Sequence, residues 1–155
     1  MKKIKLTQGK YALVDNEDFE RLNQFKWCFN GRYAVRSIYN PKNKKWEIWY
    51  MHWSIIGKPP QKTETDHINC NGLDNRKENL RIVTQNENRM NRGKQKNNTS
   101  GFKGVAWYKD YKKWTARIMA NGVSMYLGVF DDKNKAAKAY NDASKKYHKE
   151  FSRIA

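Results

Sequence analysis

The chain has 155 residues, a length that suits one domain of ordinary size or two small ones. Its 32 Lys and Arg outnumber its 15 Asp and Glu, which gives a formal net charge of +17. A chain this basic favours a polyanionic partner, so nucleic acid is the first candidate and an anionic membrane surface is the second. No apolar run approaches the ~20 residues that cross a bilayer, and no apolar segment follows the first lysines, so we expect neither a transmembrane helix nor a signal peptide.

The first 60 residues read as short strands and helices. Alternating apolar residues and turn residues predict strands at 3–8 and 11–15 around a Gly9–Lys10 turn, a helix at 16–27 with Asn16 as its N-cap, a hairpin of strands at 32–39 and 45–51, and a short helix at 52–57. Cys28 and Cys70 are the only cysteines and form no CxxC pair, which excludes a four-cysteine zinc site. We expect both to be reduced thiols of a cytoplasmic protein.

Residues 65–91, TDHINCNGLDNRKENLRIVTQNENRMN, concentrate Asp, His and Asn among a few apolar anchors. A disordered polar tract would lack Leu73, Leu80, Ile82 and Val83. The segment predicts a strand ending at Asp66 and His67, a turn, a second strand at 79–84, and a helix that opens with a capping box at Thr84 and Glu87.

Two other interpretations of this segment remain open. The spacing His67-x-Asn69-x-Asn71-Gly72-x5-Glu78 fits an EF-hand calcium loop except at its first position, which needs an oxygen ligand. Alternatively, the segment is a polar surface loop built from Asx turns, with a histidine that serves no chemistry.

The composition changes at residues 89–100, RMNRGKQKNNTS, which carry basic residues, no acidic ones and few apolar groups. We assign residues 1–91 to one domain with its motif core at about 63–91, residues 92–100 to a basic linker, and residues 101–155 to a second domain. The linker is either a solvated spacer or a tether that lies along a phosphate backbone, and both can be true.

Residues 101–155 predict three strands followed by one helix. The strands are expected at 102–109, 112–120 and 123–130, with turns at Asp110–Tyr111 and Asn121–Gly122. The helix places Ala136, Tyr140, Ala143 and Tyr147 on one stripe, which we expect to cover the sheet, with Asp131 or Asp132 as its cap.

The first domain resembles the HNH (ββα-metal) endonucleases, in the homing form found in phages and introns. The matching residues are Asp66, His67, Ile68, Asn69, Asp74, Asn75, Arg76, Glu78, Asn79, Leu80 and Asn88, and the resemblance extends upstream through ALVDNEDF, YAVRSI and MHWSIIGKPP. It covers most of residues 5–91. Cys70 departs from the pattern, because such sequences usually show Gly at this place.

This resemblance implies a role for each residue of the motif. Asp66 and Asn88 would hold one divalent cation, most simply Mg²⁺ with Mn²⁺ as an alternative, and Asn91 is the rival to Asn88. His67 would be the general base, and Asn79 would orient the histidine or the scissile phosphate. His52 and, by its place at a helix end, His148 are expected to be structural.

The second domain resembles an AP2 DNA-binding domain, which lays its three-stranded sheet in the major groove. The resemblance is carried by Gly104, Val105, Trp114, Ala116, Ile118, Leu127, Gly128, Phe130, Ala136, Ala137, Ala139, Tyr140 and Ala143. Ala106 stands where plant members commonly have Arg. The residues that we expect to contact DNA are Arg89, Arg92, Lys94, Lys96, Lys103, Tyr108, Lys112, Lys113, Arg117 and Tyr126.

The sequence therefore predicts an α+β protein, with an N-terminal HNH nuclease domain and a small C-terminal AP2-like domain. We expect a metal-dependent endonuclease that hydrolyses phosphodiester bonds of double-stranded DNA, acting as a monomer without an obligate protein partner. It would work in the bacterial cytoplasm if the chain is phage-encoded. The alternative is a catalytically inactive DNA-binding regulator.

Overall fold

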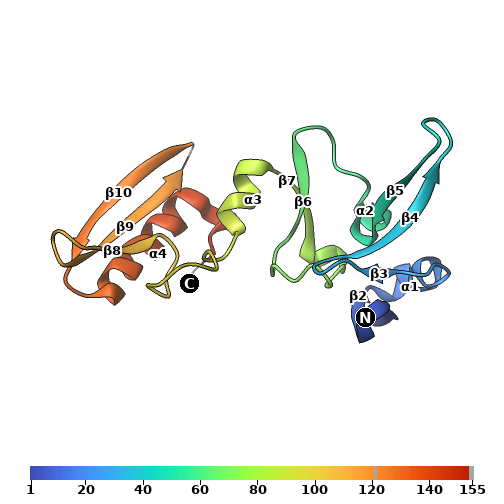
Figure 1. The fold of residues 1–155 in the computed structure, drawn as a ribbon, viewed down its shortest axis with the longest axis horizontal. Helices are drawn as coiled ribbons and strands as arrows, with labels where there is room; N and C mark the ends of the chain where they lie inside the picture. Colours follow the sequence, from blue (N-terminus) through green and yellow to red (C-terminus); the bar gives the residue numbers. More distant parts are fainter. Residues whose placement is uncertain (121, 154–155) are drawn as a thin grey trace. The chain divides into compact units, whose positions relative to one another are not determined.

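The computed structural model describes residues 1–120 and 122–153. The chain forms two compact units, Met1–Thr84 and Gln85–Ala155 (Figure 1). The division falls directly before the helix of the HNH-like segment, whereas the sequence assigns residues up to 91 to the first domain. Within the described ranges, no helix is long and apolar enough to cross a membrane.

The first unit begins with an antiparallel pair, β1 (Lys2–Lys5) and β2 (Tyr11–Val14), joined through the short 3₁₀ helix η1 (Thr7–Gly9). Both predicted strands are thus present, but the first ends at Lys5, and Thr7 and Gln8, predicted as strand, lie in η1. The helix α1 (Asn16–Asn23) follows. Asp15 and not Asn16 occupies its N-cap position, and the helix stops four residues before the predicted end, so the cap prediction was wrong by one residue.

A three-stranded sheet and a short helix come next. The strands β3 (Cys28–Phe29), β4 (Ala34–Asn40) and β5 (Lys45–Tyr50) pair in chain order, all antiparallel. This confirms the predicted hairpin. The helix α2 (Met51–Ile56) starts directly after β5 and ends at Gly57, whose φ of 85° lies in the region that favours glycine.

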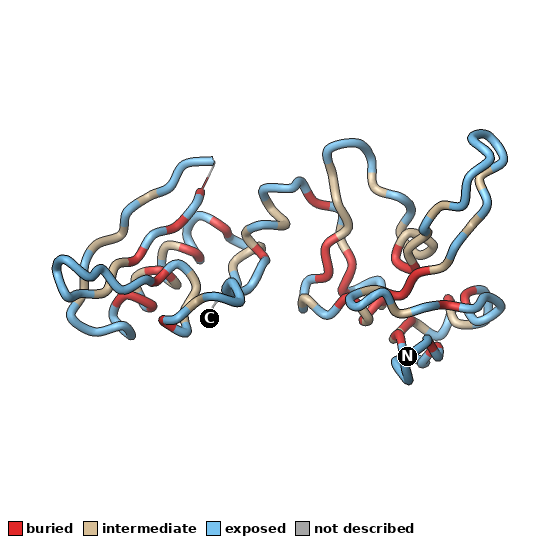
Figure 2. The backbone as a smooth tube through the Cα atoms, viewed as in Figure 1, coloured by how far each residue is buried: buried red, intermediate tan, exposed pale blue. Residues whose placement is uncertain are grey.

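The core of this unit gathers side chains from β1, β2, α1, β4 and α2. Its buried members are Ile4, Leu6, Ala12, Val14, Leu22, Trp27, Ala34 and Met51. The indole Nε1 of Trp27 donates to the carbonyl of Leu22 over 2.9 Å, which satisfies the one polar atom that this ring brings into the core. The tip of the β4–β5 hairpin stays exposed (Figure 2).

The last elements of the first unit are β6 (Thr63–His67), the 3₁₀ helix η2 (Lys77–Asn79) and β7 (Leu80–Thr84). The two strands pair antiparallel along their whole length, from Thr63 opposite Thr84 to His67 opposite Leu80. The second unit opens with α3 (Gln85–Asn91), which confirms the helix start predicted from Thr84.

The second unit continues as an antiparallel sheet and one long helix. The strands β8 (Val105–Tyr108), β9 (Lys113–Ala120) and β10 (Val123–Phe130) stand in the order β10-β9-β8, as predicted. The helix α4 (Lys133–His148) and the 3₁₀ helix η3 (Lys149–Phe151) follow. Of the predicted Asn121–Gly122 turn, Asn121 lies outside the described residues.

The helix α4 packs against one face of this sheet. Asp132 is its N-cap, because its carboxylate accepts from the backbone nitrogen of Asn134 over 2.6 Å. The side chains that α4 buries are Ala136, Ala137, Tyr140, Ser144 and His148. The predicted stripe is therefore right at Ala136 and Tyr140 but wrong at Tyr147, which is exposed, because the buried face turns toward Ser144 and His148.

Along β9 the side chains alternate between the two faces of the sheet. Ala116, Ile118 and Ala120 are buried toward α4, whereas Lys113, Arg117 and Met119 are exposed on the outer face (Figure 2). This period of two is the signature of a sheet covered on one side. The outer face is therefore available for contacts with a partner.

Gly104 makes the closest approach in the second unit. Its φ is 70°, and a Cβ atom built on it would lie 2.3 Å from the Tyr140 ring and 2.5 Å from the carbonyl oxygen of Arg117. Gly104→Ala should therefore destabilise the second unit by roughly 2–4 kcal/mol. Hydrogen exchange should show faster exchange of β8–β10 amides, with β4–β5 amides of the same variant unchanged. Equal protection of the sheet in variant and wild type would contradict this packing.

Candidate active site and nucleic-acid interface

The pairing of β6 with β7 fixes the place of the two predicted catalytic neighbours. Asp66 stands opposite Arg81 and His67 opposite Leu80, at the end of the strand pair. The exposed fractions of Asp66 and His67 are only 6% and 5%. The pair is thus held in a largely desolvated environment, with little more than an edge of each side chain reaching solvent.

The loop between the two strands, residues 68–79, is fastened to β2. The backbone nitrogen of Leu13 donates to the carbonyl of Leu73, and the nitrogen of Asn75 donates to the carbonyl of Leu13, each over 2.8 Å. These two bonds form a parallel bridge between Leu13 and Asp74. The loop is therefore tied to the core of the first unit through its backbone.

Side-chain amides supply the remaining hydrogen bonds of this loop. Asn79 accepts from the backbone nitrogen of Asn69 over 2.9 Å and donates both to the carbonyl of Asp74 and to the side chain of Asn69, over 2.7 and 3.0 Å. Asn69 and Asn71 each accept from the backbone nitrogen two residues on, as Asx turns do. The many Asn side chains of this segment thus supply hydrogen-bond acceptors for backbone N–H groups of a loop that is not part of a β-sheet.

These contacts contradict the calcium-loop interpretation. The side-chain oxygens of Asn69 and Asn71 accept from the loop backbone, and a carboxylate oxygen of Glu78 accepts from Arg76 over 2.5 Å. The same oxygens would have to converge on a cation in an EF-hand. The Asx turns of the polar-loop interpretation are present, but they serve to build the site.

Asp74, to which the sequence assigned no role, stabilises the loop through an ion pair and a further hydrogen bond. Asp74 is 2% exposed and forms a two-point ion pair with Arg76, from Nε and Nη2 over 2.8 and 2.7 Å. The hydrogen bonds from Arg76 keep the pKa of Asp74 below its ordinary value. This carboxylate also accepts from Asn69 over 2.8 Å, so it locks two ends of the loop together.

Asn75 is one of the residues that match the HNH pattern, but the sequence assigned it no role. It is fully buried, and its Oδ1 lies 3.3 Å from Nε2 of His67. Because an amide oxygen only accepts, the neutral imidazole carries its proton on Nε2 and its basic lone pair on Nδ1. The Nδ2 atom of Asn75 is buried without a hydrogen-bond partner among the described residues. Only the tertiary structure reveals this contact.

The environment of His67 sets its protonation state. Burial lowers the pKa of His67 below its ordinary value of 6.5, while the hydrogen bond with Asn75 and the charge of Asp66 partly oppose this shift. The imidazole is therefore neutral at physiological pH. A neutral imidazole with a defined tautomer is the form that a general base needs.

A cluster of rings packs around His67. The ring of His52 lies edge-on to it with centroids 5.2 Å apart, and the ring of Tyr33 contacts both histidines at 5.4 and 5.6 Å. Gly72 makes room for this cluster, because a Cβ atom there would lie 2.6 Å from the Tyr33 ring. These ring contacts restrict the orientation of the imidazole in addition to its contact with Asn75.

His52 is structural in this arrangement, as expected. It stacks on Tyr50 with ring centroids 5.1 Å apart and is 5% exposed. Burial, and to a lesser extent the nearby His67, lowers the pKa of His52 to about 3. It therefore stays uncharged and adds no positive charge beside His67 at physiological pH.

Cys70 adopts the backbone conformation that its departure from the family pattern suggests. Its φ is 62°, in the left-handed region, and its backbone nitrogen donates to the carbonyl of His67 over 2.7 Å. Glycine occupies this conformation with the least strain. The cysteine thus strains the turn and leaves the neighbouring groups in place.

Asp66 is paired with Arg81. Nε of Arg81 donates to Oδ2 of Asp66 over 2.9 Å, and Nη2 lies 2.9 Å from the same oxygen. Both contacts go to one oxygen, and a carboxylate has about four lone-pair positions, so a cation can share this group. Within residues 1–120 and 122–153, no three or more His, Cys, Asp and Glu side chains are placed to hold a metal ion. A carboxylate and an amide oxygen, completed by water and phosphate, nonetheless fit the preferences of Mg²⁺.

The two candidate ligands on α3 belong to the second unit. Asn88 is half-buried, and Asn91 is 5% exposed. Asp66 lies in the first unit, so each residue is placed only within its own unit.

The outer face of the β8–β10 sheet brings together the predicted DNA contacts of the second unit. Arg117 pairs with Tyr126 across β9 and β10, and Tyr108 pairs with Lys113 across β8 and β9, and all four are exposed. The guanidinium of Arg117 lies 5.7 Å from the centre of the Tyr126 ring. Lys112, in the turn before β9, has a positive φ of 48° and is also exposed.

The other predicted contacts lie on α3 and the segment that follows it. Arg89, Arg92, Lys94 and Lys96 are exposed, whereas Lys103 is half-buried and donates to the carbonyl of Met90 over 2.5 Å. His148 is structural, as expected, but for another reason than the helix dipole. Its ring bonds to the carbonyl of Met119 over 2.7 Å and to Ser144 over 3.2 Å.

Residues 48–90 match the model of a family described as HNH endonuclease. This range includes α2, the β6–β7 pair and α3 up to Met90, so it contains Asp66, His67, Asn79 and Asn88 but not the rival ligand Asn91. HNH nucleases generally use a divalent metal. No solved structure matches the chain.

Two viral proteins are similar to this chain, and one of them is named as an HNH endonuclease. Protein 3.8 of Escherichia phage T7 is 31% identical over 91 residues, which cover 59% of this chain and 73% of that protein. An uncharacterized HNH endonuclease of Acanthamoeba polyphaga mimivirus is 26% identical over 145 residues, which cover 94% of this chain and 74% of the relative. The chain therefore belongs to the HNH endonuclease family and is a nuclease.

Proposed function

We propose that this nuclease hydrolyses phosphodiester bonds of double-stranded DNA at a preferred site, with His67 as the general base. The observation that carries the proposal is the setting of His67. Its ring is desolvated, its Nε2 faces Asn75 at 3.3 Å, and it follows directly on Asp66. This combination keeps the ring neutral and gives it one basic nitrogen.

In the proposed reaction, Nδ1 of His67 takes a proton from a water molecule while the water oxygen attacks the phosphorus atom. The bond from phosphorus to the 3′ oxygen breaks, and the leaving oxygen is protonated by solvent. Neighbouring residues of a strand project to opposite faces, so Asp66 and His67 can act on different sides of one phosphate. In-line displacement needs this arrangement.

The metal belongs to the same proposal. The resemblance assigns it to Asp66 and Asn88, whose oxygen donors suit Mg²⁺, with Mn²⁺ as an alternative. A divalent cation held there would supply positive charge to the phosphate and to the leaving oxygen. Arg81 meanwhile orients the carboxylate of Asp66 through Nε.

Asn79 is proposed as a positioning residue. The sequence suggested that it orients the histidine or the phosphate, but its three side-chain hydrogen bonds run to Asn69 and Asp74 within the loop. Since Asn75 belongs to this loop, Asn79 acts on His67 through the shape of the loop. Replacing Asn79 would change the shape of the loop, and it would affect proton transfer at His67 only through that change.

We further propose that the second unit is an AP2-like domain that selects the site. The antiparallel order β10-β9-β8, the single covering helix and an outer face that carries Lys113, Arg117 and two tyrosines support this. A β-sheet of this kind can enter the major groove, where base edges are distinguishable. A nuclease joined to a separate reading unit is also the arrangement that a homing-type enzyme would use.

The first prediction tests the general base. His67→Ala should lower the rate of plasmid nicking by about 10²–10⁴, because a general base contributes this much to rate and little to affinity. DNA binding should stay within a few-fold of wild type. Nicking in the presence of Mg²⁺ and its loss in EDTA provide the reference for wild type. A variant that keeps most of its nicking rate would remove His67 from the reaction.

The second prediction concerns the pH dependence. Since the pKa of His67 is lowered, wild-type cleavage should rise with pH, reach half its maximum below pH 6.5 and be flat at neutral pH. Asn75→Asp places a carboxylate against Nε2 and favours the protonated ring, so the midpoint should move to higher pH. Single-turnover rates from pH 5 to 9 measure both midpoints. An unmoved midpoint in Asn75→Asp would separate Asn75 from the acid–base step.

The third prediction tests the reading unit. Replacing both Arg117 and Tyr126 by Ala should remove site preference while the nicking rate at saturating DNA changes less than tenfold. Lys135→Ala with Lys138→Ala, on the exposed side of α4, is the control and should keep the preference. Cleavage maps on long DNA give the readout. If the double variant cuts the same positions as wild type, the sheet does not choose the target.

A further inference from the structure

A groove of about 890 Å³ lies within the second unit, between the segment after α3 and the sheet. One wall is the chain from Arg92 to Thr99, and the other is formed by β8, β9 and Ser124 of β10. Gly104, Ile118 and Tyr140 contribute to its floor. We infer that this groove binds the sugar–phosphate backbone of one strand of the substrate DNA.

The wall formed by the segment after α3 is built into the unit by hydrogen bonds. Nζ of Lys94 donates to the carbonyl of Gly101 over 3.0 Å, and Nδ2 of Asn98 donates to the carbonyl of Phe102 over 2.8 Å. Ser100, which is buried, donates to the carbonyl of Val105 over 2.8 Å. These bonds hold the segment beside the start of β8, so it is a fixed surface of the second unit.

The charge of the groove points to a polyanion. Five cationic side chains line it, and no acidic side chain does so among the described residues: Arg89, Arg92, Lys94, Lys103 and Arg117. The side chains of Arg89 and Arg92 make no hydrogen bond or ion pair within the described ranges. Two arginines with this freedom are suited to take phosphate oxygens by paired hydrogen bonds.

The size of the groove decides between a strand and a duplex. A volume of 890 Å³ lies in the range of sites for ligands of a few hundred daltons, which corresponds to about two or three nucleotides and not to a whole helix. One backbone can therefore lie in the groove while the rest of the duplex stays outside. The contacts of Arg89 and Arg92 would be with phosphates and would position the DNA without reading its sequence.

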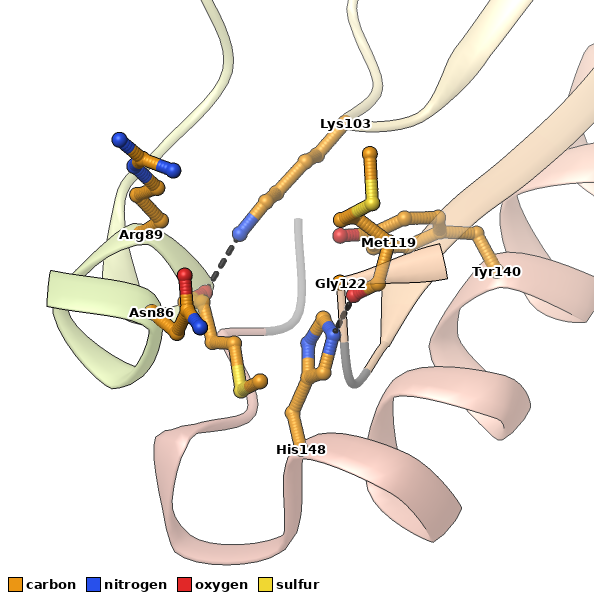
Figure 3. A pocket seen from close by; sticks show the side chains of 8 residues that line it. Asn86, Arg89, Lys103, Met119, Gly122, Tyr140 and His148 are labelled. Atoms are coloured by element: carbon orange, nitrogen blue, oxygen red, sulfur yellow. Dashed lines mark hydrogen bonds between the residues drawn. The ribbon is translucent and has the colours of Figure 1, made fainter. Parts of the chain in front are cut away.

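The end of the groove nearest α3 passes into a smaller pocket of about 210 Å³ (Figure 3). The pocket shares Arg89, Lys103, Met119 and Tyr140 with the groove. Figure 3 shows the Lys103 side chain reaching across to the carbonyl of Met90, and His148 bonded to Met119 below it.

The inference rests on the proposed function, because the ligand is the DNA that the nuclease cuts. It adds that the groove starts on the HNH segment itself. Arg89 lies on α3, which follows β7 directly, and the family match ends at residue 90. Arg89, which would hold these phosphates, is thus separated along the chain from the strand pair that carries His67 by only a few residues of α3.

The test uses phosphate ethylation interference with the full-length protein, on a duplex where the wild-type nick has been mapped. Wild type should show interference at about two or three consecutive phosphates of one strand that depend on the groove. In the double variant Arg89→Gln with Arg92→Gln, these positions should lose their interference. The slope of log K against log salt concentration should become less steep by about 2 units.

Two matched variants control for charge and folding. Lys135→Gln with Lys138→Gln removes the same charge from the exposed side of α4 and should leave the interference pattern unchanged. Arg89→Lys with Arg92→Lys keeps the charge and should retain most of the slope.

Three outcomes would overturn the inference: an unchanged pattern in the Arg89→Gln, Arg92→Gln variant, a loss on both strands alike, or an equal loss in the α4 control. In each of these cases metal-dependent nicking by wild type would leave the proposed function standing. If wild type neither binds nor nicks DNA, the proposed function fails first and the groove inference falls with it.

Discussion

The two hydrogen bonds between the backbone of Leu13 and the loop at residues 73–75 are the constraint on which the active site depends. They join the loop between β6 and β7 to β2, and the side chains of Ala12 and Val14 on β2 are part of the core. Through them the packing around Val14 and Leu22 determines where Asn75 stands, and Asn75 determines the tautomer of His67. The N-terminal strands are therefore part of the site, although they contribute no reacting group.

Desolvation acts on the two histidines of the ring cluster to different extents. His52 has its pKa lowered to about 3 and is simply an aromatic ring at any pH where the enzyme works. His67 is less perturbed, because Asn75 and Asp66 stabilise its protonated form. The same burial thus makes one histidine inert and leaves the other able to gain and lose a proton. The nearby carboxylate and amide account for the difference.

Much of the architecture could be predicted from the sequence, because it is written in local patterns. The β4–β5 hairpin follows from Asn40–Pro41 between alternating strands, and the motif residues predicted the β6–β7 pair and α3. Local sequence patterns do not predict the structure where two neighbouring residues suit the same position equally well. Asp15 and Asn16 are both good caps, and the α4 stripe could turn toward Tyr147 or toward Ser144, until the bond from His148 to Met119 decides it.

The candidate site was predictable in its residue types but not in its contacts. The motif locates Asp66 and His67, yet nothing in the sequence tells that Asn75 faces the imidazole or that Arg81 pairs with Asp66, since both contacts arise from strand register and loop shape. The segment after α3 was ambiguous for the same reason. Its hydrogen bonds to Gly101 and Phe102 involve backbone groups, which carry no residue-specific signal.

The close approach at Gly72 has a consequence for how this sequence can drift. A side chain at this position would need the space of the Tyr33 ring, and it would also meet the carbonyl oxygen of Arg32 at 2.5 Å. Moving that ring would disturb both histidines that it touches. A lineage that loses the glycine would have to shift the backbone at Arg32 as well as the Tyr33 ring, so position 72 should stay glycine among relatives that keep this ring cluster. The tolerance of the active site to mutation is limited in this way by a residue with no side chain.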